Sequence, residues 1–207
     1  WTMDETSGTI VDLCGNNDNG TISGIVTQGV TGKYNKGIEF KGVALANNAY
    51  VSFGSGTSLD NLGARTIVAW IKPDNLGEGS LGVILSKDYQ DGWVLRLSAS
   101  NNVAFSQAFG GGVVTWRTTT NALVMGSFQH VAVRYSAAAT TTGPEIYING
   151  VKQTIVASGT PFGSRDSDAA FSLNLGIEGG IQEFDGVMDE VAVFNRVLTD
   201  AELTEIR

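Results

Sequence analysis

The sequence is poor in the residues that form disulfides and transition-metal centres. It contains one cysteine, one histidine and three prolines among 207 residues. A single cysteine, Cys14, excludes an internal disulfide, and a single histidine excludes a histidine-rich metal site. The cysteine count leaves the compartment open, because disulfide-free domains occur in the cytosol, outside cells and in virions.

Long apolar runs and clusters of basic residues are also missing. No apolar stretch approaches the roughly 18–20 residues of a membrane span, so we expect no membrane insertion. The chain has 13 Lys and Arg against 21 Asp and Glu, a formal net charge of −8 at pH 7. Phosphate-backbone binding needs clustered Lys and Arg, so we expect no nucleic-acid partner. No signal peptide is visible, and a chain that begins with Trp1 rather than Met is expected to be a processed product or a fragment.

Glycine is abundant, and its distribution indicates many turns. The 27 glycines show neither collagen spacing nor a Gly/Ser linker tract, which is typical of turns between short strands. A chain that is 42% hydrophobic at this length can fill one core, so we expect a single domain over residues 1–207. Apolar–polar alternation predicts strands at 1–5, 37–42, 50–53, 65–73, 81–86, 92–98, 103–108, 113–117, 128–135, 171–177 and 187–194, and a hairpin at 145–151. These strands predict two packed antiparallel sheets.

The last predicted strand carries a carboxylate in an unfavourable place. Period-2 alternation puts Asp189 on the same face as Val187, Val191 and Val193. A carboxylate among apolar side chains is costly unless it is paired, hydrogen-bonded or bound to a cation. The partner of Asp189 is therefore the first question that the sequence raises.

A helix is expected directly after this strand. Thr199-Asp-Ala-Glu202 is a capping box of the form S/T-x-x-E, in which the first and last side chains satisfy each other's main-chain N–H groups. It predicts one short helix near residues 199–207, the only substantial helix in the chain.

The sequence of the C-terminal segment is similar to the sequence pattern of a known family. The stretch FDGVMDEVAVFNRVLTDAELTEI, residues 184–206, resembles the closing signature of laminin-G-like, concanavalin A-like jelly-roll domains, with its Phe-x-Gly, I-D-E-V and N-R-x-L-(S/T) elements. Residues 1–20 are similar to the opening of the same family, with Cys14 where Ser is usual, and segments between 37 and 151 match further motifs. The resemblance implies an all-β fold, a concanavalin A-like jelly-roll sandwich of two antiparallel sheets with one short C-terminal helix.

Calcium is the cofactor that the sequence favours. Hard cations select carboxylate and carbonyl oxygens, which the Asn- and Asp-rich loops supply. The resemblance implies one structural calcium ion, with Asp189 as principal ligand and backbone oxygen near Gly42 and Asp4 or Asp12 completing the shell. Lys41 stands where the family commonly has Asp, which removes one acidic ligand. The alternative is that a salt bridge or backbone hydrogen bonds satisfy Asp189.

Two tryptophans are candidates for a binding surface. Trp93 and Trp116 have polar neighbours in the sequence, and Arg117 adjoins the second. A flat indole beside a fork of hydrogen-bond donors suits a sugar ring, so these three residues are the predicted ligand-binding set. The alternative is that both indoles are ordinary strand aromatics, as we expect for Trp70 among its apolar neighbours.

Catalytic motifs are weak. The only histidine, His130, lies on a predicted strand without a nucleophile-elbow motif nearby, which favours a structural role. Glycosidases of the resembled superfamily carry E-x-D-x-x-E on one strand, and the nearest approach, from Glu183 through Asp185 to Met188, ends in methionine. Asp185-Gly186 is moreover expected to be a turn, which would break the shared face.

The function that the sequence favours is therefore recognition without catalysis. We expect a non-catalytic, carbohydrate- or surface-recognising, lectin-like module of a larger extracellular, cell-surface or virion protein. Its partner would be a glycan or another component of a cell surface or virion. Two alternatives stay open, a structural or adhesive domain that binds protein, and a glycoside hydrolase or lyase whose catalytic pair comes from separate strands.

Overall fold

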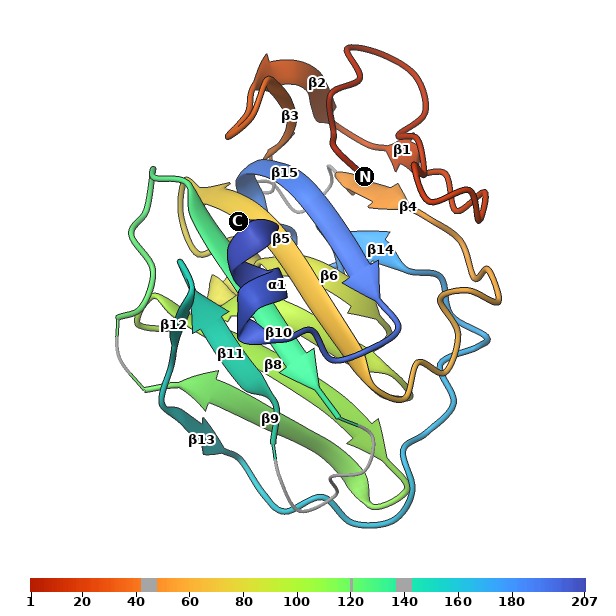
Figure 1. Ribbon diagram of the computed structural model, residues 1–207, viewed down its shortest axis with the longest axis vertical. Coiled ribbons are helices and arrows are strands. Elements are labelled where there is room, and N and C mark those ends of the chain that lie inside the picture. The colour runs from red at the N-terminus through yellow and green to blue at the C-terminus, as the bar shows by residue number, and fades with distance from the viewer. Residues whose placement is uncertain (42–47, 120, 137–142) are drawn as a thin grey trace.

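The computed structural model describes residues 1–41, 48–119, 121–136 and 143–207. They form two antiparallel sheets packed face to face, with one α-helix on the outer face of one of them (Figure 1). The predicted fold class, a jelly-roll sandwich with a short C-terminal helix, is confirmed. No helix in these ranges is long and apolar enough to cross a membrane.

The first sheet has eight strands in the order β1-β4-β14-β6-β7-β8-β9-β13. Their bounds are Thr21–Ser23 (β1), Tyr50–Ser52 (β4), Val83–Lys87 (β6), Trp93–Ser98 (β7), Asn102–Phe109 (β8), Gly112–Thr118 (β9), Ile155–Ala157 (β13) and Asn174–Leu175 (β14). The short strand β14 comes late in the sequence but lies between β4 and β6, so it brings the loops that flank it to the middle of the sheet (Figure 1).

The second sheet has seven strands in the order β12-β11-β10-β5-β15-β3-β2. Their bounds are Val26–Thr31 (β2), Lys36–Lys41 (β3), Arg65–Pro73 (β5), Gln129–Tyr135 (β10), Glu145–Ile148 (β11), Val151–Lys152 (β12) and Asp185–Phe194 (β15), and a 3₁₀ turn occupies Glu78–Ser80 (η1). The apolar strand β5 lies at the centre between β10 and β15, as expected for a strand that is buried on both faces.

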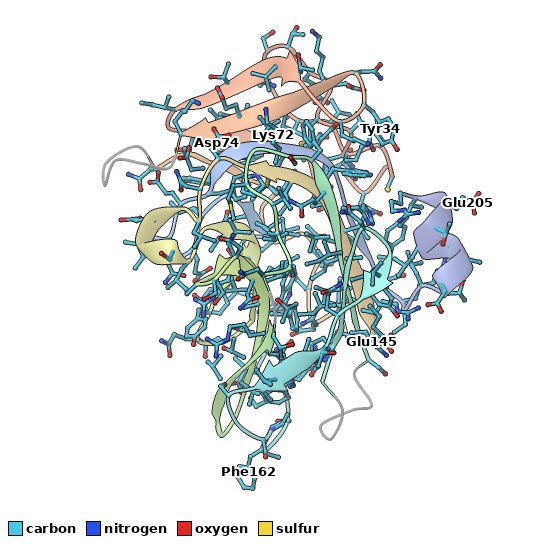
Figure 2. The ribbon with its side chains drawn as sticks, turned by 90° about the vertical axis from the view of Figure 1, so that its left-hand side faces the viewer. Tyr34, Lys72, Asp74, Glu145, Phe162 and Glu205 are labelled. Carbon is cyan, nitrogen blue, oxygen red and sulfur yellow. The ribbon has the colours of Figure 1, made fainter. Side chains whose placement is uncertain are left out.

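One hydrophobic core fills the space between the sheets (Figure 2). Alternate residues of β5, namely Ile67, Ala69 and Ile71, face this core, and Leu95 and Phe105 are among the residues that enter it from the first sheet. Burial of this apolar surface is the main force that holds the two layers together.

The C-terminal helix α1 (Asp200–Glu205) packs on the outer face of the second sheet. The Thr199 hydroxyl accepts a hydrogen bond from Glu202 N (3.3 Å), and the Glu202 carboxylate accepts one from Thr199 N (2.8 Å). The predicted capping box is therefore confirmed. Leu203 packs into a second apolar cluster with Val68, Ala132, Tyr147 and Leu198.

Two sequence-based expectations about strands are wrong. Residues 1–5 form no strand, because Met3 has a left-handed φ of 61° and interrupts the extended chain. Trp1 bonds to the sheet through a reciprocal pair of 3.0 Å main-chain hydrogen bonds with Val191. Asp185 and Gly186, expected as a turn, are the first two residues of β15.

The phase of β15 also differs from the expectation. A bulge interrupts its register between Asp189 and Ala192, and Glu190 adopts a left-handed φ of 49°. Beyond the bulge, Val191 and Val193 face the core, whereas Asp189 lies opposite Trp70. The extra residue therefore separates Asp189 from Val191 and Val193, whereas Val187 stays on the same face as Asp189.

Candidate functional site

Asp189 is fully buried and accepts hydrogen bonds from the main chain. Its Oδ2 accepts from Tyr34 N (2.9 Å) and its Oδ1 from Glu190 N (2.9 Å). The turn between β2 and β3 lies so close that a Cβ on Gly32 would come within 2.6 Å of Oδ2. Burial raises the pKa of Asp189, while bonds from Tyr34, Lys33 and Glu190 lower it. Hydrogen bonds to this turn thus supply the partner of Asp189.

The other predicted calcium ligands have their own partners or lie outside the described residues. Asp4 accepts a hydrogen bond from Lys36 N (3.0 Å), and Asp12 accepts from three N–H groups of its own loop. Gly42 belongs to the segment that the structure does not describe. Elsewhere, no group of three or more His, Cys, Asp or Glu side chains in the described ranges is arranged to hold a metal. The three carboxylates thus accept hydrogen bonds from main-chain N–H groups, and calcium stays a prediction.

The expectation that Trp93 and Trp116 lie on an open face is wrong. Their exposed fractions are 1% and 4%, and both belong to the core between the sheets. Phe105 stacks between them, with ring centroids 6.3 Å from Trp93 and 6.5 Å from Trp116. Neither indole can stack on a sugar in this arrangement. Arg117, the third residue of the predicted set, is exposed on the opposite side of β9.

The outer face of the first sheet carries a row of polar side chains. The strand register aligns one outward-facing residue from each of seven neighbouring strands, namely Thr21, Ser52, Asn174, Ser86, Val94, Ser106 and Thr115. The middle of this row is buried at Ser86, Val94 and Ser106. Every residue of the row except Val94 carries a hydroxyl or amide group, so the row is suited to hydrogen bonding rather than to apolar packing.

A cavity of about 580 Å³ opens at the β4–β14 end of this row. Strand β4 supplies Tyr50 and Ser52, strand β14 supplies Asn174, and Asp88 follows the end of β6. The lining is completed by residues of the neighbouring segments, Ser23, Asn48, Phe171, Ser172, Ile177, Glu178, Gly179 and Gly180. Hydroxyl, amide and carboxylate groups therefore converge on one space that also contains two aromatic rings.

The charge of this first cavity is negative. Glu178 is only 9% exposed, and its Oε1 accepts a hydrogen bond from Tyr89 N (3.0 Å). Burial raises the pKa of Glu178, hydrogen bonds from Ser86 and Tyr89 lower it, and the nearby Asp88 raises it. Among the described residues no lysine or arginine lines the cavity, and the charge of Arg96 nearby lowers the pKa of Glu178. Its carboxylates can therefore accept hydrogen bonds from the hydroxyl groups of a ligand.

A second cavity, of about 400 Å³, lies by β9 on the same sheet. Its lining contains Arg117 with Ser100, Asn102 and Thr119, and no acidic residue. The two cavities therefore differ in sign of charge.

Sequence reasoning included Arg117 and missed the first cavity. Tyr50 and Asn174 both lie within strands that it predicted, on the positions that alternate with the core residues Val51 and Leu175. Polar side chains at these outward positions were the signal that the sequence offered. That the two residues lie close together follows only from the pairing of β4 with β14.

The described residues thus combine a two-sheet sandwich with polar cavities on one outer face. The chain belongs to the concanavalin A-like lectin/glucanases superfamily, whose Laminin_G_3 model matches residues 45–204. Curated protein sequences contain no match.

Several solved structures share the fold at low sequence identity. The binding domain of Paraclostridial Mosquitocidal Protein 1 has a TM-score of 0.73 and 19% identity, over 97% of this chain and 51% of that chain. Domain 4 of AbnA, a GH43 extracellular arabinanase from Geobacillus stearothermophilus, in complex with arabinotriose, has a TM-score of 0.62 and 20% identity, over 100% and 95%. The botulinum neurotoxin serotype D ligand binding domain in complex with N-acetylneuraminic acid has a TM-score of 0.67 and 12% identity, over 99% and 51%. The chain thus spans about half the length of these two toxin domains.

Proposed function

We propose that this chain is a carbohydrate-binding module and that its first cavity holds a neutral, hydroxyl-rich sugar. The observation that carries this proposal is the convergence of Asn174, Glu178 and Asp88 with the rings of Tyr50 and Phe171 on one space. A sugar presents hydroxyl groups at its edge and C–H groups on its faces, so it needs both kinds of partner.

Charge and likeness support the same ligand class. The carboxylates of Asp88 and Glu178 suit hydroxyl donors and disfavour an acidic sugar at this place. Among the proteins of similar fold, one domain was solved with arabinotriose, a neutral sugar, and another with N-acetylneuraminic acid, an acidic one. The likeness therefore supports a sugar as the ligand, and the charge of the cavity selects the neutral class. A lectin-like module of this kind would act at a cell surface, outside the cell or on a virion, where glycans are displayed.

Titration calorimetry with arabinotriose, after a glycan array that includes it, tests the proposal. Removing the amide in Asn174→Ala should weaken binding about tenfold, because one or two buried hydrogen bonds to the sugar are lost. The matched control is Asn121→Ala, which removes an exposed asparagine that does not line the cavity. Equal losses in both variants, or no glycan bound by the wild-type chain, would contradict the proposal.

A second function is favoured by one observation. Glu178 and Asp88 line the same cavity, and the pKa of Glu178 is raised, mainly by burial, as a general acid requires. Glycoside hydrolysis by two carboxylates is therefore the runner-up. A reducing-sugar assay on the bound glycans decides it: turnover that Glu178→Gln abolishes while binding persists would favour the hydrolase, and absence of product would favour the binding module.

A further inference from the structure

Two arginines lie side by side on the outer face of the first sheet. The register places Arg96 of β7 opposite Ala104 of β8, and Ala104 opposite Arg117 of β9. Adjacent strands are about 4.8 Å apart, so the two arginine backbones are roughly 10 Å apart with only a methyl group between them. Both side chains leave the sheet on the same side, next to the row of hydroxyl groups.

The guanidinium of Arg117 has no partner in the described part of the chain. It is exposed, and no hydrogen bond, ion pair or ring contact engages it there. By contrast, Lys87, Arg134 and Lys152 all form ion pairs with carboxylates. The five N–H donors of Arg117 are therefore available to a ligand.

Arg96 contacts neutral groups, and its charge acts on the carboxylate of Glu178. Its Nη1 donates to Gln182 Oε1 (3.1 Å), and its guanidinium carbon lies 5.1 Å from the centroid of the Tyr89 ring. Its Nε is buried and has no hydrogen-bond partner among the residues described. These contacts hold the side chain near Gln182, Tyr89 and Glu178, on the β6 side of β7, so its charge reaches the space beside Arg117 only at long range.

The second cavity places polar side chains around the charge of Arg117. Arg117 lines it together with the hydroxyl and amide side chains of Ser100, Asn102 and Thr119, and no acidic residue does. A guanidinium binds a planar carboxylate through two parallel hydrogen bonds, and neighbouring hydroxyl and amide groups can hold the rest of a sugar.

The charge of the whole chain limits the size of the acidic ligand. A net charge of −8 repels polyanions at long range. A ligand with a single acidic group avoids most of this repulsion and still gains the local contact with Arg117.

We propose that the second cavity binds the carboxylate of one acidic sugar residue, a uronic or a sialic acid at the end of a glycan, through Arg117. That the ligand is a glycan rests on the proposed function, whereas the acidic group rests on the unpartnered guanidinium of Arg117 in this cavity.

The test compares each acidic sugar with its own methyl ester, because esterification removes the charge and leaves the rest of the sugar. Trisaccharides ending in glucuronic acid and in sialic acid are titrated at low and at high salt, which distinguishes the two sources of the carboxylate. We expect at least one acid to bind about tenfold more tightly than its ester at low salt and to lose this advantage at high salt. Arg117→Gln should remove the advantage, and Arg117→Lys should restore part of it.

Lys36→Gln is the matched control, since it removes one exposed positive charge on the other sheet. It should leave the preference for the acid unchanged, and a thermal melt of each variant confirms that it is folded. Equal affinity for acid and ester, or a preference that survives Arg117→Gln, overturns the proposal. If arabinotriose still binds in that case, the proposed function stands without it. If no sugar binds at all, both fall.

Discussion

Replacement of Asp189 tests what joins the last strand to the N-terminal part of the chain. Its carboxylate accepts main-chain bonds from Tyr34 and Glu190, one on each oxygen. Asp189→Asn keeps one acceptor and places an NH₂ group against an N–H donor. Asp189→Val removes both acceptors and leaves two part-buried N–H groups without these partners.

The sizes of these effects follow from the bonds and from the cost of burying the charge. A hydrogen bond to a charged group contributes about 1.5–3 kcal/mol, and an unsatisfied buried donor costs about 1–3 kcal/mol. Both substitutions also relieve the burial cost that raises the pKa of Asp189, so part of the loss is offset. We therefore expect Asp189→Asn to lower the free energy of unfolding by about 1–2 kcal/mol and Asp189→Val by about 3 kcal/mol.

Urea unfolding, followed by tryptophan fluorescence in calcium and in chelator, measures these losses. Glu190→Gln is the control, because the adjacent side chain should contribute less than about 0.5 kcal/mol. If hydrogen bonds alone satisfy Asp189, the wild-type curves coincide in both media. If calcium binds there, chelator should destabilise the wild-type protein and leave Asp189→Asn unaffected. A stable Asp189→Val protein would refute the reasoning altogether.

Three further predictions concern other parts of the fold. Burial lowers the pKa of His130 to about 4, so its contribution to stability is present above its ordinary pKa of about 6.5 and is lost as pH falls toward 4. The free energy of unfolding should therefore fall by about 2 kcal/mol between pH 7 and pH 5. An NMR titration that gives a pKa near 6.5 would disprove this prediction. Thr199→Ala should lower the free energy of unfolding by about 1 kcal/mol, because the capping box at α1 is broken, and unchanged urea curves would show that the cap is not needed. Trp93→Ala should cost about 3–5 kcal/mol through the cavity it leaves in the core, while calorimetry on the folded fraction should show unchanged affinity for any glycan; a selective loss of binding would return Trp93 to the site.

Local patterns in the sequence predicted most strands and the helix, whereas the residues that line the first cavity are brought together by pairing between distant strands. The capping box at Thr199 involves residues close in sequence, so it could be recognised without the fold. Tyr50 and Asn174 are distant in sequence, and they meet because β14 inserts between β4 and β6. That order depends on which strands pair across the whole sheet, which periodicity within one strand cannot show.

The bulge in β15 could not be predicted for a different reason. Simple alternation assumes one residue per position, and the left-handed conformation of Glu190 adds an unpaired residue. Glutamate has no special preference for that conformation, so nothing at this position of the sequence announced it. Asp189 consequently lies on the outer side of the sheet, under the turn that carries Tyr34.

The tryptophans show why adjacency in sequence is a poor guide to a surface on a strand. Trp116 and Arg117 are neighbours, and successive side chains of a strand point to opposite faces. The alternation that buries Trp116 therefore directs Arg117 outward, onto the face that also carries Thr115. A binding surface on a sheet has to be sought at every second residue and across paired strands. By that rule Arg117 lies on the same outer face as Arg96, on the register through Ala104, and the acidic-sugar site rests on this outward direction of Arg117.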